Sequence, residues 1–223
     1  MRSLYSQWIF GAVMVSTAAC GAATAQTRPP APPAVHAHPP APADTGQRRH
    51  TAADTRFMQG MIAHHAQAVV MTRMVPTHTE NAGLRLLAQR IDLSQQDEMA
   101  TMRRWLRDRG EPVPPADTGH AAHHVPGMQH EPAGHGAMPG MLTAQELARL
   151  DAARGVEFDA LFLELMIRHH QGALVMVEQL LATPGAGQEP ETFTFASEVD
   201  ADQRAEIARM QGMLAAISPM ARP

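Results

Sequence analysis

The sequence predicts an all-α fold, an antiparallel four-helix bundle made from two duplicated helical hairpins. The first observation is composition: 44% of the 223 residues are hydrophobic but only 4% are aromatic. The core is therefore expected to be aliphatic and rich in methionine, which suits helices better than sheets. The second observation is a double-histidine block that occurs twice, 105 positions apart. The third is that the segments after the two blocks also match each other. One hairpin cannot bury its apolar face alone, whereas two packed hairpins form a bundle.

The duplicated block consists of nine paired positions with no internal gap. The first copy comprises Asp54, Phe57, Met58, Met61, Ile62, His64, His65, Ala68 and Met71. The second copy comprises Asp159, Phe162, Leu163, Met166, Ile167, His169, His170, Ala173 and Met176. Both copies show the apolar spacing of a helix.

Residues 1–25 have the features of an export signal. Arg2 supplies a positive charge, residues 8–19 are an apolar run, and residues 23–25 form a small-residue cleavage site. The only cysteine, Cys20, follows a sequence that resembles a lipoprotein cleavage box, so a lipid anchor at Cys20 and cleavage after Ala25 both stay open. We expect an exported protein of the periplasm or cell envelope, without a disulfide framework, that meets a membrane only through such an anchor.

Residues 26–50 are rich in proline and histidine and are expected to form an extended tether. The bundle domain is expected over residues 51–217. Its first helix begins at a capping-box sequence at residues 51–54 and is predicted to end near Val75, because Pro76 follows. Thr79 is predicted to cap the second helix, which extends to about Asp108.

Residues 110–141 are predicted to form a disordered linker that interrupts the domain, because proline, glycine and alanine dominate it. Five histidines in this linker suggest a weak auxiliary metal-binding arm, and a plain flexible loop is the alternative. These histidines are His120, His123, His124, His130 and His135.

The second hairpin begins with a capping box at residues 143–146, followed by a short helix that Gly155 ends or kinks. The second histidine-bearing helix is expected over residues 156–182, before Pro184. Pro190 suits the first turn of the last helix, which is expected to end before Pro219.

The residues best suited to bind a metal lie on the inward faces of the two histidine-bearing helices. For a single histidine, a hydrogen-bonded core position would be the simpler interpretation, but here four occur at matching sites beside methionines. Imidazole and thioether together favour copper, above all Cu(I), with zinc as the alternative metal. The predicted ligands are Met61, His64, Met166 and His169, followed by His65 and His170.

The second helix of each hairpin carries polar residues on an otherwise apolar face. Buried polar groups need partners, and the inward imidazoles are the available ones. We therefore predict that four residues hydrogen-bond to the imidazoles and orient them, namely Gln95, Glu98, Gln203 and Glu206. For Glu98, an ion pair with Arg103 or Arg104 at the edge of the bundle is the alternative.

The residues around the second double histidine match a known family pattern. The matching residues are Gly155, Glu157, Phe158, Asp159, Phe162, Met166, Ile167, His169, His170, Gln171, Gly172, Ala173, Gln203, Glu206, Ile207 and Met210. In these residues the chain resembles the domain-of-unknown-function family 305, over about residues 51–109 and 142–217. The resemblance implies a ferritin-like four-helix bundle, usually exported. Some members, the CopM-like proteins, are periplasmic copper binders, which implies that the inward histidines and methionines carry copper. The first copy departs from the pattern, with Ala66 and Gln67 in place of Gln171 and Gly172, so equal binding by both halves stays open.

Together these observations predict an exported protein that buffers, sequesters or delivers copper in the cell envelope. Its expected partners are the metal ion and envelope copper-transport proteins, and a homo-oligomer stays open. A metal-free helical interaction module is the first alternative, and a ferritin-like metal-dependent oxidase has weaker support. Such an oxidase would need Glu-x-x-His pairs, whereas Glu164 lies five residues before His169. Without a catalytic constellation an enzyme is not expected, and with a net charge of −4 nor is a nucleic-acid partner.

Overall fold

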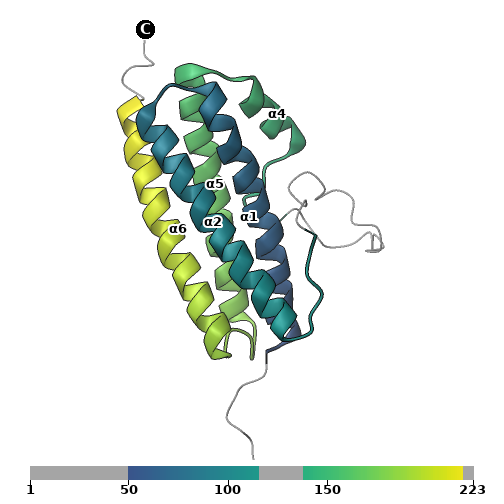
Figure 1. Cartoon of the computed structure of the whole chain (residues 1–223). Coiled ribbons are helices and arrows are strands. Elements are labelled where there is room, and N and C mark those ends of the chain that lie inside the picture. The colour runs from purple at the N-terminus through teal and green to yellow at the C-terminus, as the bar shows by residue number, and fades with distance from the viewer. Residues whose placement is uncertain (1–49, 116–137, 218–223) are drawn as a thin grey trace, which may run out of the picture. The chain divides into compact units, whose positions relative to one another are not determined.

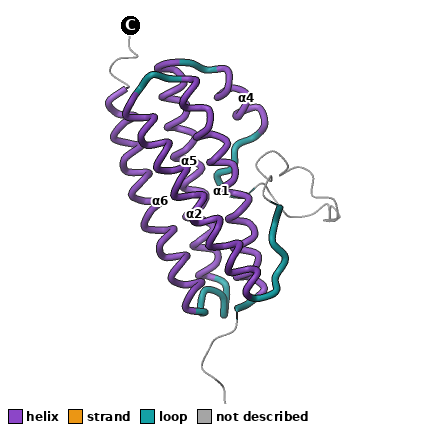
Figure 2. Tube along the Cα trace, in the orientation of Figure 1, coloured by secondary structure: helices purple, strands orange, loops and turns teal. Residues whose placement is uncertain are grey.

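The computed structural model describes residues 50–115 and 138–217, and these residues form five helices and no strand (Figures 1 and 2). The predicted all-α bundle of two hairpins is confirmed. The helices are α1 (Ala52–His78), α2 (Ala82–Asp108), α4 (Ala144–Ala152), α5 (Gly155–Ala182) and α6 (Pro190–Ile217). Within the described residues, no helix combines the length and apolar content needed to cross a membrane.

Each hairpin packs within itself, α1 against α2 and α5 against α6, and the hairpins meet along α1 and α5. The α1–α2 loop and the α5–α6 loop lie at opposite ends of the bundle, so α1 and α5 are antiparallel (Figure 1). The short helix α4 packs against α1 and α5. The two histidine-bearing helices therefore form the central contact of the bundle.

Two of the predicted helix boundaries are wrong. α1 continues through Pro76 to His78, because a proline in the last turn removes only one helical hydrogen bond. The carbonyl of Pro76 also accepts a hydrogen bond from Arg85, at 3.1 Å. The N-cap of α2 is Asn81 rather than Thr79. Thr79 instead accepts a hydrogen bond from the backbone N–H of Asn81 in the loop.

Each hairpin reaches the loop of the other through an aspartate near its first helix start. Asp54 of α1 accepts a hydrogen bond from the backbone N–H of Gly187 in the α5–α6 loop, at 2.7 Å. Asp159 of α5 accepts one from the side chain of Asn81 in the α1–α2 loop, at 2.8 Å. These two residues are equivalent positions of the duplication. The same position therefore links the hairpins at both ends of the bundle.

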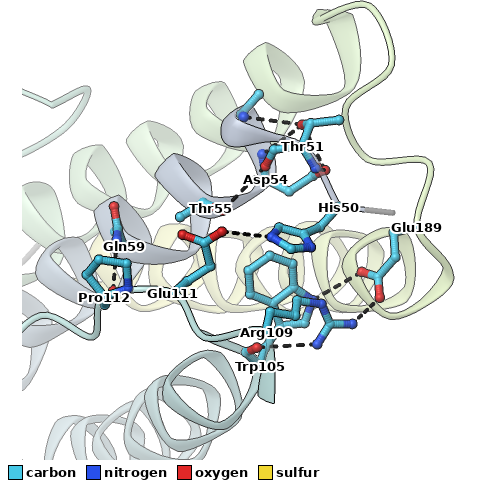
Figure 3. A network of polar contacts seen from close by, with 11 residues as sticks. His50, Thr51, Asp54, Thr55, Gln59, Trp105, Arg109, Glu111, Pro112 and Glu189 are labelled. Carbon is cyan, nitrogen blue, oxygen red and sulfur yellow. Dashed lines mark hydrogen bonds and ion pairs between the residues drawn. The ribbon is translucent and has the colours of Figure 1, made fainter. Parts of the chain in front are cut away.

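At the end where α1 begins, a polar network joins the residues just before α1, the C-terminal end of α2 with the residues that follow it, and the residue just before α6 (Figure 3). His50 pairs with Glu111 at 2.8 Å, and its ring meets the Trp105 ring edge to face. The indole N–H of Trp105 donates to Glu189 at 3.1 Å, and Arg109 pairs with Glu189. His50 and Glu111, predicted to lie in the tether and the linker, are thus part of the folded domain.

The apolar core consists of two clusters, one toward each end of the bundle. The first includes Met58, Met61, Met102, Val177 and Phe195. The second includes Ile91, Phe158, Phe162, Met166 and Met210. On α2, α5 and α6 the two clusters are separated by buried polar residues. We call this polar level, together with its counterpart on α1, the imidazole layer. It comprises His64, His65, Gln95, His169, His170 and Gln203.

Candidate metal centre

The four histidines of the imidazole layer lie in the middle of α1 and α5, and none has any exposed surface. The rings of His64 and His169 stack across the contact between the two helices, with centroids 3.9 Å apart and planes tilted by 35°. His65 and His170 flank this pair, with ring centroids 6.3 Å from His64 and 6.2 Å from His169, respectively. The duplication thus brings its two double histidines together at the centre of the bundle.

The two stacked histidines donate to backbone carbonyls. Nε2 of His64 lies 3.0 Å from the carbonyl oxygen of Pro139, and Nε2 of His169 lies 3.1 Å from the carbonyl oxygen of His64. A carbonyl oxygen only accepts hydrogen bonds, so each Nε2 must carry the proton. In the neutral ring, Nδ1 is then the nitrogen with the free lone pair.

The two flanking histidines donate to carboxylates from the neighbouring helices. His65 pairs with Glu98 of α2, and His170 pairs with Glu206 of α6 at 2.6 Å. Both pairs follow the predicted arrangement, although their role beside a metal stays a prediction. A carboxylate that accepts from one ring nitrogen fixes the tautomer and raises the basicity of the other, as occurs behind metal-bound histidines.

All four Nδ1 atoms are buried and have no hydrogen-bond partner among the described residues. Such atoms are rare in native proteins, because an unpaired buried acceptor costs about 1–3 kcal/mol. The four unpaired Nδ1 atoms lie at one level of the core, and the opposite nitrogen of each ring is hydrogen-bonded to an oxygen, so these Nδ1 atoms are the candidate nitrogen donors of the layer.

Burial keeps the stacked pair neutral. Desolvation, followed by the charge of the neighbouring His65, lowers the pKa of His64 to about 3. Desolvation, followed by the charge of His64, lowers the pKa of His169 well below its ordinary value. Neutral imidazole is the form that ligates metals, so no proton has to leave these two rings at neutral pH.

The amide side chains of the layer do not bond as predicted. Gln95 has no partner for its Nε2 or its Oε1, and Gln203 has none for its Oε1, within the described part of the chain. The reason is that the imidazole N–H groups are already taken, by Glu98 and Glu206 one turn further along and by backbone carbonyls. The alternative ion pair of Glu98 with Arg103 or Arg104 is also not formed among the described residues, where Arg103 contacts the sulfur of Met99 and Arg104 bonds Thr101.

The predicted methionine ligands are fully buried but do not lie together. Met61 belongs to one apolar cluster and Met166 to the other. The structure therefore brings His64 and His169 together without bringing their methionines to a shared point. Among the described residues, no group of three or more His, Cys, Asp or Glu side chains is arranged to hold a metal ion. Methionine is not one of these four residue types. A site formed by imidazole and thioether ligands is therefore a different class of site.

Sequence reasoning missed one component of this centre, the segment Met138 to Leu142, which we call the strap. The carbonyl of Pro139 is the acceptor for His64, and Leu142 forms two hydrogen bonds with Gln67. Apart from Leu142, the strap lies in the stretch 110–141 predicted to be a disordered linker, and that prediction is wrong at both described ends. The carbonyl of Pro112 at the other end accepts a hydrogen bond from Gln59. The five linker histidines, at positions 120, 123, 124, 130 and 135, lie outside the described residues.

Residues 54–214 match the family described as Domain of unknown function (DUF305). Among solved structures, a DUF305 fragment from Deinococcus radiodurans is 32% identical over 74% of this chain and 97% of that chain, with a TM-score of 0.59. A DUF305 protein from Streptomyces coelicolor, assigned to the secreted class, is 29% identical over 74% and 94%, with a TM-score of 0.60. CopM in its Cu(II)-bound form is 29% identical over 73% and 95%, with a TM-score of 0.55. CopM in Cu(I)-bound and Ag-bound forms is also similar. No curated protein matches the chain.

Proposed function

The chain belongs to the DUF305 family, and from this premise we propose that it is an exported copper-binding protein of the cell envelope. Copper is bound through the imidazole layer and through methionines beside it, on the inner faces of the two duplicated helices. The bound metal is buffered, sequestered or handed to envelope copper-transport proteins.

One observation carries this proposal: four buried imidazoles whose Nδ1 atoms find no hydrogen-bond partner in residues 50–115 and 138–217. His65 and His170 are backed by carboxylates, and His64 and His169 by carbonyls. This is the hydrogen bonding that orients a histidine toward a metal. Unpaired buried nitrogens do not stabilise an apolar core, and this supports the proposal that the layer holds a cation.

The donor types favour copper. Imidazole nitrogen is a borderline ligand and thioether sulfur a soft one, a combination that suits copper, and Cu(I) in particular. His64 and Met61 lie one helical turn apart, as do His169 and Met166. The similarity to CopM, a protein solved with Cu(I), Cu(II) and Ag, supports the same class of metal here. Zinc remains the competing metal to be tested.

Export is supported by the signal-like residues 1–25 and by the similarity to a DUF305 protein assigned to the secreted class. A lipid anchor at Cys20, a homo-oligomer and transfer to a transport partner stay predictions. Of these, the lipid anchor and the envelope transport partner would place the bound copper outside the cytoplasm.

The test is a titration of the purified full chain with Cu(I) under reducing conditions, against a competing chelator, and in parallel with Zn(II). The decisive variant is His64→Leu/His169→Leu, because leucine fills the core but offers no nitrogen. The matched control is His50→Leu/His78→Leu, which removes two histidines outside the layer.

We expect the His64/His169 variant to lose the tightest Cu(I) site, with affinity lowered at least about tenfold, while the control keeps it. Both variants retain the linker histidines, so any binding by the linker appears equally in both. Equal affinity in the two variants would contradict a metal site in the imidazole layer. Preference for Zn(II) over Cu(I) would retain the site but reject copper as its cargo.

A further inference from the structure

The two stacked histidines occupy equivalent positions of the duplication but have different hydrogen-bond acceptors. His169 donates to a carbonyl within helix α1, that of His64, which the helix holds in place. His64 donates to Pro139, which lies in the strap and in no helix. The tautomer of one imidazole is therefore fixed by the bundle, and that of the other depends on a separate segment.

The strap crosses α5 in direct backbone contact at Gly172. A Cβ atom at Gly172 would lie 2.0 Å from the carbonyl oxygen of Pro139, a distance much shorter than real Cβ contacts. A Cβ atom at Gly140 would lie 2.6 Å from the carbonyl oxygen of Arg168, and Gly140 has a φ of 75°, which favours glycine. Only glycine at these two positions lets the strap approach closely enough for its carbonyl to reach His64.

Gln67 fixes the other end of the strap. Its side-chain oxygen accepts from the backbone N–H of Leu142 at 2.7 Å, and its side-chain N–H donates to the Leu142 carbonyl at 3.0 Å. The Gln67 side chain is buried, at 3% exposure, so neither bond competes with water. The amide thus acts as a two-point anchor from α1.

Gln67 and Gly172 are equivalent positions in the two copies of the duplicated block. The difference between the copies therefore has a structural explanation. The imidazole layer has two equivalent halves, but only one strap passes over it. The α1 half therefore supplies the side chain that binds the strap, Gln67, and the α5 half supplies the glycine that leaves room for it, Gly172. The first copy departs from the family pattern at Gln67, which is the position where the two halves must differ to hold the strap.

We propose that Gln67 and Gly172 are positioning residues of the copper site. They hold the strap so that the Pro139 carbonyl keeps His64 protonated on Nε2 and leaves its Nδ1 free for the metal. The two halves of the site are then unequal, with His169 held by a helix and His64 held by the strap. The metal part of this inference rests on the proposed function, whereas the control of the His64 ring by the strap does not.

The first variant is Gly172→Ala, whose added methyl group forces the Pro139 carbonyl away. The matched control is Gly212→Ala, which makes the same change inside α6, where an added Cβ meets nothing within 4 Å. The second test variant is Gln67→Leu, which removes both bonds to Leu142 without changing the contact at Gly172. All are made in the full chain, and circular dichroism reports whether the bundle is retained.

The first readout is the nitrogen-15 and proton NMR signature of the His64 ring in the metal-free protein. Wild type and Gly212→Ala are expected to show a protonated Nε2 that exchanges slowly with solvent. In Gly172→Ala and Gln67→Leu we expect exchange of this proton to accelerate about tenfold or more, as for one lost hydrogen bond, with His169 unchanged. A merely structural role of the strap would leave the His64 ring signature as in wild type.

The second readout is Cu(I) affinity measured by chelator competition. We expect it to fall about tenfold in Gly172→Ala and Gln67→Leu and to stay unchanged in Gly212→Ala. Unchanged His64 exchange in both test variants would overturn the inference even if Cu(I) binds normally. If one test variant fails to fold, the other decides. A changed His64 signature in a protein that binds no Cu(I) would retain the strap's role and reject only the copper function.

Discussion

The buried imidazole of His64 links the protonation of one residue to the stability of the fold. Its pKa is about 3 in the folded protein, against an ordinary value of 6.5, because burial disfavours the charged ring. Above pH 6.5 both the folded and the unfolded states are neutral at this residue, and no stability is lost. As the pH falls below 6.5, the unfolded state takes up a proton that the folded state refuses, so stability decreases until the folded pKa is reached.

We therefore expect the free energy of unfolding to fall by about 2 kcal/mol between about pH 7 and about pH 5 from His64 alone, with His169 adding in the same direction. The measurement is urea unfolding of the metal-free protein at both pH values. The His64→Leu/His169→Leu variant lacks both groups and should lose distinctly less stability over the same range. A pH dependence as large as that of wild type would assign the effect to other residues.

The carboxylates behind His65 and His170 should contribute to metal affinity rather than to folding. Substitution by glutamine keeps the length of the side chain but replaces a charged acceptor with a neutral one, which weakens the bond to the ring N–H. For Glu98→Gln and for Glu206→Gln we expect Cu(I) affinity to fall about 10–100-fold. Glu164→Gln, an exposed position on α5, is the control and should bind as wild type does.

At the scale of the elements, the equivalent residues Asp54 and Asp159 should differ in energetic weight. Besides binding Gly187, Asp54 completes the capping box of α1 by accepting from the backbone N–H and the hydroxyl of Thr51. Among the described residues, Asp159 accepts only from Asn81, and its other oxygen has no partner there. We expect Asp54→Ala to cost about 2–3 kcal/mol and Asp159→Ala about 1 kcal/mol. Urea midpoints of the two variants measure the order, and a larger loss for Asp159→Ala would contradict the assignment.

The helices were the predictable elements, because each depends on local signals. The capping boxes at Thr51 and Thr143, the apolar spacing around each double histidine and the proline at the start of α6 locate four of the described helices, namely α1, α4, α5 and α6. The inward direction of the four histidines followed from the same spacing and is observed. The strap was not predictable, because its contacts with His64 and Gln67 join residues 75 positions apart. A stretch rich in proline and glycine has no periodicity that could reveal such contacts.

Similar reasoning explains which site residues could be identified. Duplication at matching positions singled out the histidines and the glutamates. The spacing along one helix could not tell whether Met61 and Met166 meet across the antiparallel contact, and the structure places them in different clusters. Nor could it show whether Gln95 or Glu98 would reach the imidazole, because both lie within one turn and only the packing of α2 decides between them.

At the scale of the whole molecule, the imidazole layer divides one apolar core into two. A polar layer of this kind stabilises a fold only if its groups are satisfied, and several of them lack a partner among the described residues. The layer should therefore be a net cost to the metal-free bundle. The three buried glutamines allow a direct test, because the same substitution should have opposite effects at different positions.

Gln95 is 1% exposed, and neither polar atom of its amide has a partner in the part of the chain that the structure describes. Gln67 is 3% exposed and forms two hydrogen bonds to Leu142. Replacing an unpaired buried amide by leucine removes its desolvation penalty and adds apolar packing. Gln95→Leu should therefore stabilise the metal-free protein by about 1–3 kcal/mol, and Gln203→Leu should act in the same direction. Gln67→Leu leaves the backbone groups of Leu142 unpaired and should destabilise by a similar amount.

Thermal or urea unfolding of the three variants decides the sign at each position. Stabilisation by Gln95→Leu with unchanged Cu(I) affinity would make this amide a defect of the core without a role in binding. Stabilisation together with weakened binding would mean that the bundle keeps the amide at the expense of stability, as expected where a site is maintained for function. Destabilisation by Gln95→Leu would instead show that the amide is satisfied in solution, and the imidazole layer would then have to be regarded as an ordinary hydrogen-bonded part of the core.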